Sequence, residues 1–252
     1  MREFYINDDG IRLHAKLDMP DGMTEESAKC PLCIVIHGLT GHMEERHITA
    51  AARVMNEEGM ATLRVEMYGH GKSEGAFENH TLYKWLTNAM TVTDYAKTLP
   101  FVTDLYVAGH SQGGLTTMLL AGLKPDDFKA IIPMSPALVI VYGAKKGSFL
   151  GLEFDPDHIP EKMSLAGPLN IKSNYIRVAQ TIDIDAAIRK YHGLVLLIHG
   201  TADEAVPFED SVDAAGKYEH ATLVPIEGDL HCYNYHLDKV LDAIRSFIKE
   251  VK

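Results

Sequence analysis

A serine flanked by glycines lies between a predicted strand and a predicted helix. Gly109-His110-Ser111-Gln112-Gly113 follows a short apolar run at 105–108 and opens a helical pattern at 113–123. A tight strand-to-helix turn projects a serine hydroxyl into a cleft, and its close backbone approach leaves no room for flanking side chains. A helix N-capping serine in an ordinary turn is the alternative, but it would require neither this position nor this spacing. We therefore predict that Ser111 is a nucleophile.

A histidine near the end of the chain is placed to activate this serine. A serine hydroxyl is a weak nucleophile at neutral pH and needs an adjacent base. Among 13 histidines, His231 occupies the loop after the last predicted strand, where this topology places the base. His220 precedes that strand, His236 lies on the following helix, and the side chain of His110 must leave the turn in another direction. We predict His231 as the base.

The turn after the preceding predicted strand contains a carboxylate. Asp203 follows the apolar run at 194–198, and an acid there would hold the imidazole in one tautomer and stabilise its cation. Glu204 is the competing carboxylate, and acidic residues are common in turns. The acid in this turn would be weak evidence by itself. The chain order Ser111, Asp203, His231 makes the set specific.

Acyl transfer also requires backbone N–H groups that face the developing negative charge. We assign one to Gln112, directly after the nucleophile. We assign the other to Leu39, in the turn His37-Gly38-Leu39 after the first predicted parallel strand. His37 could instead be a catalytic histidine, but its order relative to Ser111 argues against that role.

The elements that must position these residues are short apolar runs that alternate with longer helical patterns. Most runs are continuous, as expected of parallel strands covered on both faces. The predicted strands are 32–36, 61–65, 105–108, 130–134, 194–198 and 222–226, and the predicted helices are 44–58, 82–98, 113–123, 208–218 and 235–251. A hairpin precedes them around Asp9-Gly10. We predict an α/β fold with a mostly parallel, twisted sheet and helices on both faces.

One long segment interrupts the alternation. Residues 136–186 contain glycines, prolines and scattered aromatics without a clean strand–helix pattern. A structureless loop of this length in a compact domain is unusual unless it is functional. We predict a small inserted cap, or lid, subdomain at 136–186 over a core formed by 1–135 and 187–252. A pair of ordinary irregular connections is the alternative.

Composition excludes several classes of protein. A net charge of −11 argues against a nucleic-acid partner and against adsorption to anionic membranes. The N-terminus lacks the apolar stretch of a secretory signal, and no apolar run is long enough to span a membrane. Cys30 and Cys33 form a Cys-x-x-Cys pair, which can be a redox or metal motif, but no second Cys or His pair lies near it at zinc spacing and Cys232 is far away. We interpret Cys30 and Cys33 as buried small hydrophobes. We expect a cytoplasmic protein with a small-molecule ester substrate and no metal or cofactor, and a homodimer is left open.

With these residues placed, the whole chain resembles the α/β-hydrolases. The motifs that carry this resemblance are His37-Gly38, Arg64-Val65-Glu66-Met67-Tyr68-Gly69-His70-Gly71-Lys72-Ser73, the turn at Ser111, His199-Gly200-Thr201-Ala202-Asp203 and His231. Within that superfamily the chain is similar to bacterial cinnamoyl (feruloyl) esterases. The motifs for this similarity are Gly41-His42-Met43-Glu44-Glu45-Arg46-His47, His110-Ser111-Gln112-Gly113-Gly114, Asp155-Pro156-Asp157-His158-Ile159-Pro160 and Tyr175-Ile176-Arg177-Val178-Ala179-Gln180.

The resemblance implies hydrolysis of hydroxycinnamic acid esters, with a cap aromatic, Tyr175, at the phenolic end of the substrate. An aromatic that only packs the cap is the alternative for Tyr175. The chain departs from the family in two ways. Leu39 stands where such esterases often have Phe, and 138–143 and 148–152 are mostly apolar or Gly where some relatives carry polar contacts to the phenol.

The leading interpretation is a carboxylic ester hydrolase that acts on hydroxycinnamoyl esters through a Ser–His–Asp triad and an acyl-enzyme. A general carboxylesterase or monoacylglycerol lipase would use the same triad on aliphatic acyl chains. A non-catalytic ligand-binding protein is disfavoured by the intact triad. A serine peptidase is disfavoured because the predicted organisation has no second large domain to screen substrates. The fold alone does not decide among them.

Overall fold

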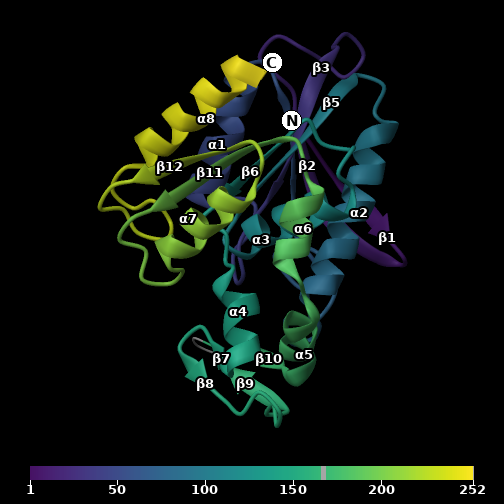
Figure 1. Ribbon diagram of the computed structural model, residues 1–252. Coiled ribbons are helices and arrows are strands. Elements are labelled where there is room, and N and C mark those ends of the chain that lie inside the picture. Colours follow the sequence, from purple (N-terminus) through teal and green to yellow (C-terminus); the bar gives the residue numbers. More distant parts are fainter. Residues whose placement is uncertain (166–168, 252) are drawn as a thin grey trace.

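The computed structural model describes residues 1–165 and 169–251 and is built around an eight-stranded sheet (Figure 1). The strand order is β1-β2-β4-β3-β5-β6-β11-β12. Its strands are β1 (Arg2–Asp8), β2 (Ile11–Asp18), β3 (Cys30–Ile36), β4 (Ala61–Val65), β5 (Val102–His110), β6 (Ala130–Met134), β11 (Leu194–Gly200) and β12 (Ala221–Ile226). β2 is antiparallel to both β1 and β4, and the other neighbours are parallel. The predicted mostly parallel α/β sheet is confirmed.

The central strands are buried on both faces, which explains why their sequences read as continuous apolar runs. Every residue of β3 and β4 is buried. Because successive side chains of a strand alternate between faces, Cys30 and Cys33 pack into different hydrophobic clusters on the two sides of the sheet. Both cysteines are buried, as expected from the sequence.

Helices cover each face of the sheet (Figure 1). They are α1 (Arg46–Glu57), α2 (Leu82–Thr98), α3 (Gln112–Leu123), α6 (Ile184–Lys190), α7 (Phe208–Lys217) and α8 (Leu237–Val251). Apolar residues of α1 and α8 join one hydrophobic cluster, whereas those of α2, α3 and α6 join the other. No helix among the described residues is long and apolar enough to cross a membrane.

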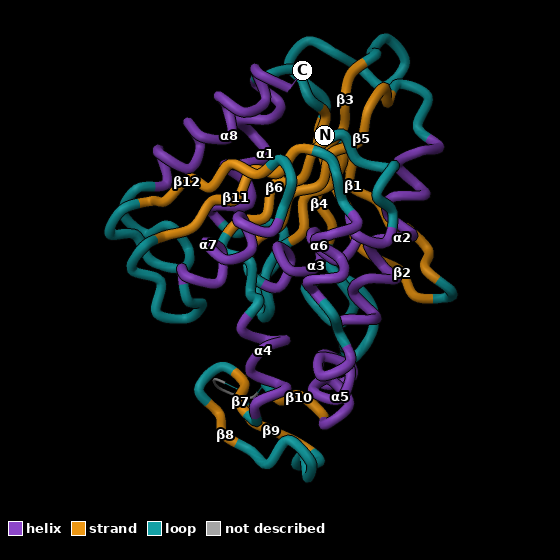
Figure 2. The backbone as a smooth tube through the Cα atoms, viewed as in Figure 1, coloured by secondary structure: helices purple, strands orange, loops and turns teal. Residues whose placement is uncertain are grey.

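The segment predicted as a cap consists of short elements that project from one end of the sheet (Figure 2). They are α4 (Val139–Lys146), β7 (Ser148–Phe149), β8 (Leu152–Glu153), β9 (Lys162–Ser164), β10 (Asn170–Lys172) and α5 (Ser173–Thr181). The predicted boundary at residue 186 falls inside α6, which packs against α3 in the core layer. We use the name cap segment for α4 to α5, and a separate subdomain stays a prediction.

Candidate active site

Ser111 lies at the sharp turn between β5 and α3. Its backbone has φ 57° and ψ −120°, a strained conformation for a residue with a side chain. The flanking glycines are required by close packing. A Cβ at Gly109 would lie 2.3 Å from the Gly113 carbonyl oxygen, and one at Gly113 would lie 2.4 Å from the carbonyl oxygens of Ile36 and His37. The turn therefore depends on both glycines, and it projects the serine at the carboxyl end of β5.

A cavity of about 490 Å³ opens at this serine. It is lined by Leu39, Thr40, Ser111, Leu150, Leu152, Ser164, Leu165, Ala205, Val206 and His231. Ser111 and His231 share this cavity, although no hydrogen bond joins their side chains among the described residues. Catalytic hydrogen bonds are often long before substrate binds. The wall opposite the core comes from the cap segment and is mostly leucine.

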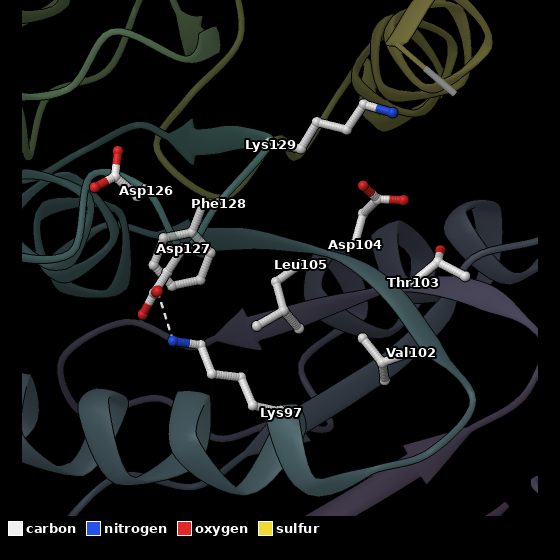
Figure 3. A pocket seen from close by; sticks show the side chains of 9 residues that line it. All are labelled: Lys97, Val102, Thr103, Asp104, Leu105, Asp126, Asp127, Phe128 and Lys129. Carbon is white, nitrogen blue, oxygen red and sulfur yellow. Dashed lines mark ion pairs between the residues drawn. The ribbon is translucent and has the colours of Figure 1, made fainter.

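Another cavity, of about 420 Å³, lies at the amino ends of central strands of the sheet, and Figure 3 shows the side chains that line it. It is formed where β5 and β6 begin, and a Lys97–Asp127 ion pair of 2.5 Å lies across it. Its lining is Lys97, Val102, Thr103, Asp104, Leu105, Asp126, Asp127, Phe128 and Lys129, which includes no candidate nucleophile–base pair. Ligands of open α/β sheets bind outside the carboxyl ends of the strands, so the cavity at Ser111 is the candidate site.

The structure joins the predicted acid to the predicted base. His231 Nδ1 lies 2.7 Å from Asp203 Oδ2. The Asp203 side chain is fully buried, whereas that of His231 is 21% exposed. The competing carboxylate, Glu204, is exposed and has no such bond among the described residues. Asp203 therefore has the position of the orienting acid, and His231 can reach the cavity with its other nitrogen.

Four hydrogen bonds hold the Asp203 carboxylate. Its Oδ1 accepts from the backbone N–H groups of Ala205 and Val206 at 2.8 and 2.9 Å. Its Oδ2 accepts from His231 and, at 3.0 Å, from His199 Nε2. Burial alone would raise the pKa of Asp203, but the hydrogen bonds from His199 and His231 outweigh burial and hold its pKa below the ordinary value. The carboxylate is therefore ionised at neutral pH.

The predicted oxyanion-hole residues lie on either side of Ser111. The turn that contains Leu39 lies against the nucleophile, since a Cβ at Gly38 would be 3.1 Å from Ser111 Cβ. Among the described residues, no atom accepts a hydrogen bond from the backbone N–H of Leu39 or Gln112. Both donors are therefore free for a ligand, and their role in binding an oxyanion stays a prediction.

Buried histidines fix the turn at Leu39. His37 Nδ1 donates to the Gly38 carbonyl oxygen at 2.7 Å, and its Nε2 accepts from the Met67 N–H. His70 accepts from the Thr40 N–H at 3.3 Å. Burial lowers the pKa of His37 to about 3, helped by the neighbouring His70, so the ring is neutral. His37 therefore supports the turn, which agrees with its exclusion as the base.

Tyr175 lies next to the residue that follows the nucleophile. Its side chain is fully buried and does not line the cavity at Ser111. Its hydroxyl donates to Gln112 Oε1 at 2.6 Å. The hydroxyl oxygen can still accept one hydrogen bond while its hydrogen is donated to Gln112. Tyr175 thus joins the cap segment to the residue after the nucleophile, and its role in substrate binding stays a prediction.

Sequence reasoning missed two buried residues that hold the triad loops. His199 donates to Asp203. The sequence feature that could have revealed it is its position four residues before the predicted acid. Asp229 is fully buried and accepts from the N–H groups of Leu230, Tyr235 and His236, which shapes the loop of His231. Its signal was an acid two residues before the predicted base. Among residues 1–165 and 169–251, no group of three or more His, Cys, Asp or Glu could hold a metal ion.

Comparisons with known proteins identify a family and similar solved structures. Residues 27–162 match the family described as serine aminopeptidase, S33. The structure of Est1E from Butyrivibrio proteoclasticus with ferulic acid bound is 54% identical, covers 98% of both chains and has a TM-score of 0.96. Human mitochondrial palmitoyl-protein thioesterase ABHD10 is 23% identical over 245 residues, 87% of this chain and 76% of its own length. Mouse alpha/beta hydrolase domain-containing protein 10 is 18% identical over the full length of both chains, with a TM-score of 0.80, and shows the fold alone.

Proposed function

We propose, from the premise that this chain belongs to the serine aminopeptidase S33 family and has the α/β-hydrolase fold, that it hydrolyses hydroxycinnamoyl esters such as feruloyl esters. The strongest support is the likeness, over almost the whole chain, to Est1E with ferulic acid bound. The Asp203–His231 bond beside the cavity at Ser111 supports the esterase chemistry.

In the proposed mechanism Ser111 Oγ attacks the ester carbonyl carbon while His231 takes its proton. Asp203 holds the imidazole and stabilises the cation that forms. The N–H groups of Leu39 and Gln112 bind the oxyanion of the tetrahedral intermediate. The C–O bond to the alcohol then breaks as His231 returns the proton to the leaving oxygen. Water attacks the acyl-enzyme with His231 again as base, which releases the free acid and Ser111.

An aliphatic acyl ester or thioester is the second candidate substrate. The cavity favours it through its apolar wall, in which Leu39, Leu150, Leu152, Leu165 and Val206 outnumber the polar groups. A relative that is 23% identical is named as a palmitoyl-protein thioesterase, and palmitoyl is an aliphatic acyl group. A planar phenylpropenoyl group and an alkyl chain both suit such a wall, so the comparison of substrates must separate them.

The test is a panel of esters with the purified protein and its Ser111→Ala variant. We expect methyl ferulate to give a higher kcat/KM than ethyl butyrate and a palmitoyl thioester, and the variant to be inactive on all three. A higher kcat/KM on the aliphatic substrates would replace our proposal with the second candidate. Turnover of an aminoacyl p-nitroanilide in preference to every ester would identify a peptidase. Cytoplasmic location and a homodimer stay predictions from the sequence.

A further inference from the structure

His199 is a buried histidine that the mechanism above does not use. It is the sixth residue of β11, its side chain is fully buried, and it lies directly beneath the turn that presents Asp203. Its Nε2 is 3.0 Å from Asp203 Oδ2 and 3.2 Å from the Val206 carbonyl oxygen. Both neighbours of this nitrogen are acceptors, since Asp203 is ionised. His199 Nε2 must therefore carry a hydrogen, whatever the charge of the ring.

The other nitrogen of the ring also has a defined partner. His199 Nδ1 is 2.7 Å from the hydroxyl of Ser211, a fully buried residue of α7. A serine hydroxyl can donate to this nitrogen when the ring is neutral, which leaves the hydrogen on the nitrogen that faces Asp203. Phe208 packs against the ring at 5.7 Å between centroids. Ser211 and the packing thus hold the ring in the orientation that points Nε2–H at the carboxylate.

We propose that His199 is a positioning residue of the triad: its Nε2–H occupies the last acceptor site of the Asp203 carboxylate and sets how strongly Asp203 holds His231. This inference rests on the proposed roles of Asp203 and His231. A carboxylate has about four lone-pair sites, and the four donors to Asp203 fill them. Because His199 and His231 share one oxygen, each bond limits the negative charge available to the other.

This competition determines the direction in which the pH dependence of kcat/KM shifts when His199 is removed. Without His199, Oδ2 concentrates its charge on His231 and stabilises the imidazolium more strongly. The acidic limb of the kcat/KM profile should then move to higher pH. The carboxylate also loses one of the contacts that fix its angle. Further titratable groups that face Asp203, His199 or His231 are Glu45, His47, His110, Asp210, Cys232 and Tyr233, and they are unchanged by the substitution.

The test compares His199→Phe, which keeps an aromatic ring without a donor, with His199→Gln, whose amide N–H can reach the same place. For His199→Phe we expect kcat/KM to fall about 10- to 100-fold, the size of a lost hydrogen bond to a charged group. We expect its acidic limb to shift upward by about half to one pH unit. His199→Gln should recover most of the rate and the parent limb. His192→Phe removes an exposed imidazole–carboxylate pair, His192–Glu219, and serves as the matched control with no change.

The rate at which a fluorophosphonate labels Ser111 is measured across the same pH range, because this reaction reads serine activation without depending on any ester. The inference would be overturned if His199→Phe kept the acidic limb of the parent kcat/KM profile and was labelled at the parent rate. The ring of His199 would then only pack. If His199→Phe does not fold, as judged by circular dichroism, His199→Asn takes its place. Its shorter amide cannot reach Asp203, so Asn and Gln variants with identical profiles would also overturn the inference. Failure of the esterase proposal is distinguished separately, by ester hydrolysis that survives in Ser111→Ala.

Discussion

The acid side of the site and the cap segment are held in place to very different degrees. The Asp203 carboxylate has four donors, all supplied by the core, and its side chain is fully buried. The cap segment contains strands of two or three residues and turns an apolar, leucine-rich wall towards the cavity. From this difference we expect the core to determine the chemistry and the cap segment to determine which acyl group fits.

The largest effect should come from the nucleophile itself. Ser111→Ala should lower kcat/KM by about five to six orders of magnitude on every ester, because the members of a triad act as a unit. The fold should be retained, as circular dichroism would show. An aliphatic ester that is still hydrolysed by the variant at the parent rate would break the comparison, since chemistry would then not reside in the core turn.

The next largest effect should come from replacing the predicted acid, Asp203, by its amide, with the neighbouring Glu204 replaced in the same way for comparison. Asp203→Asn should cost about three to four orders of magnitude in kcat/KM, because the His231 imidazole loses the acceptor that fixes its tautomer and loses its counter-charge. Glu204→Gln is the matched control and should lose little, since Glu204 is exposed. Steady-state kinetics on one phenolic and one aliphatic ester would check both variants. The reverse order of losses would show that the acid is misassigned.

Acid should destabilise the core more than the cap segment. Burial lowers the pKa of His37 and His80 to about 3 and that of His47 to about 4. The unfolded chain binds these protons below about pH 6.5, so the free energy of unfolding should fall as pH decreases from there towards 3. Each histidine contributes up to about 1.4 kcal/mol per pH unit in that window.

Thermal unfolding at a series of pH values measures how the free energy of unfolding changes with pH. In the cap segment, His158 is exposed, and its hydrogen bond to Asp155 raises its pKa, so it adds no such loss. His80→Asn can keep the hydrogen bond to the Phe77 carbonyl oxygen. Because this variant has one histidine fewer to protonate on unfolding, its free energy of unfolding should depend less steeply on pH, by the contribution of one proton. A melting temperature that does not change between pH 7 and 4 would contradict the neutral state of the buried histidines.

The smallest expected effect joins the two regions. Tyr175→Phe removes the hydroxyl that donates to Gln112 and should lower kcat/KM about 2- to 12-fold, the value of one neutral hydrogen bond. Because the lost partner belongs to the core, we expect equal losses on methyl ferulate, methyl cinnamate and ethyl butyrate. A loss confined to methyl ferulate would instead show that the Tyr175 hydroxyl binds the ring hydroxyl of the substrate.

The sequence predicts the parts of this molecule that repeat a strong local pattern. Continuous apolar runs gave the parallel strands, and the glycines around Ser111 gave the turn, because each is imposed by burial or close packing. The Asp203–His231 pairing could be predicted from chain order alone. The contact of Ser211 with His199 and that of Gln112 with Tyr175 could not, since these residues meet only through tertiary packing. The strands of the cap segment are too short, at two or three residues each, for an alternation of apolar and polar residues to be recognised in the sequence.

Labelling of the serine under competition by substrate tests the central claim most directly. The protein is treated with a fluorophosphonate, with and without methyl ferulate, and peptide mass spectrometry locates the modification while residual esterase activity is measured. We predict one modification per chain, on Ser111, with activity lost in proportion and labelling slowed by methyl ferulate. Full modification of Ser111 that leaves feruloyl ester hydrolysis unchanged, or inactivation through a different residue, would contradict the account.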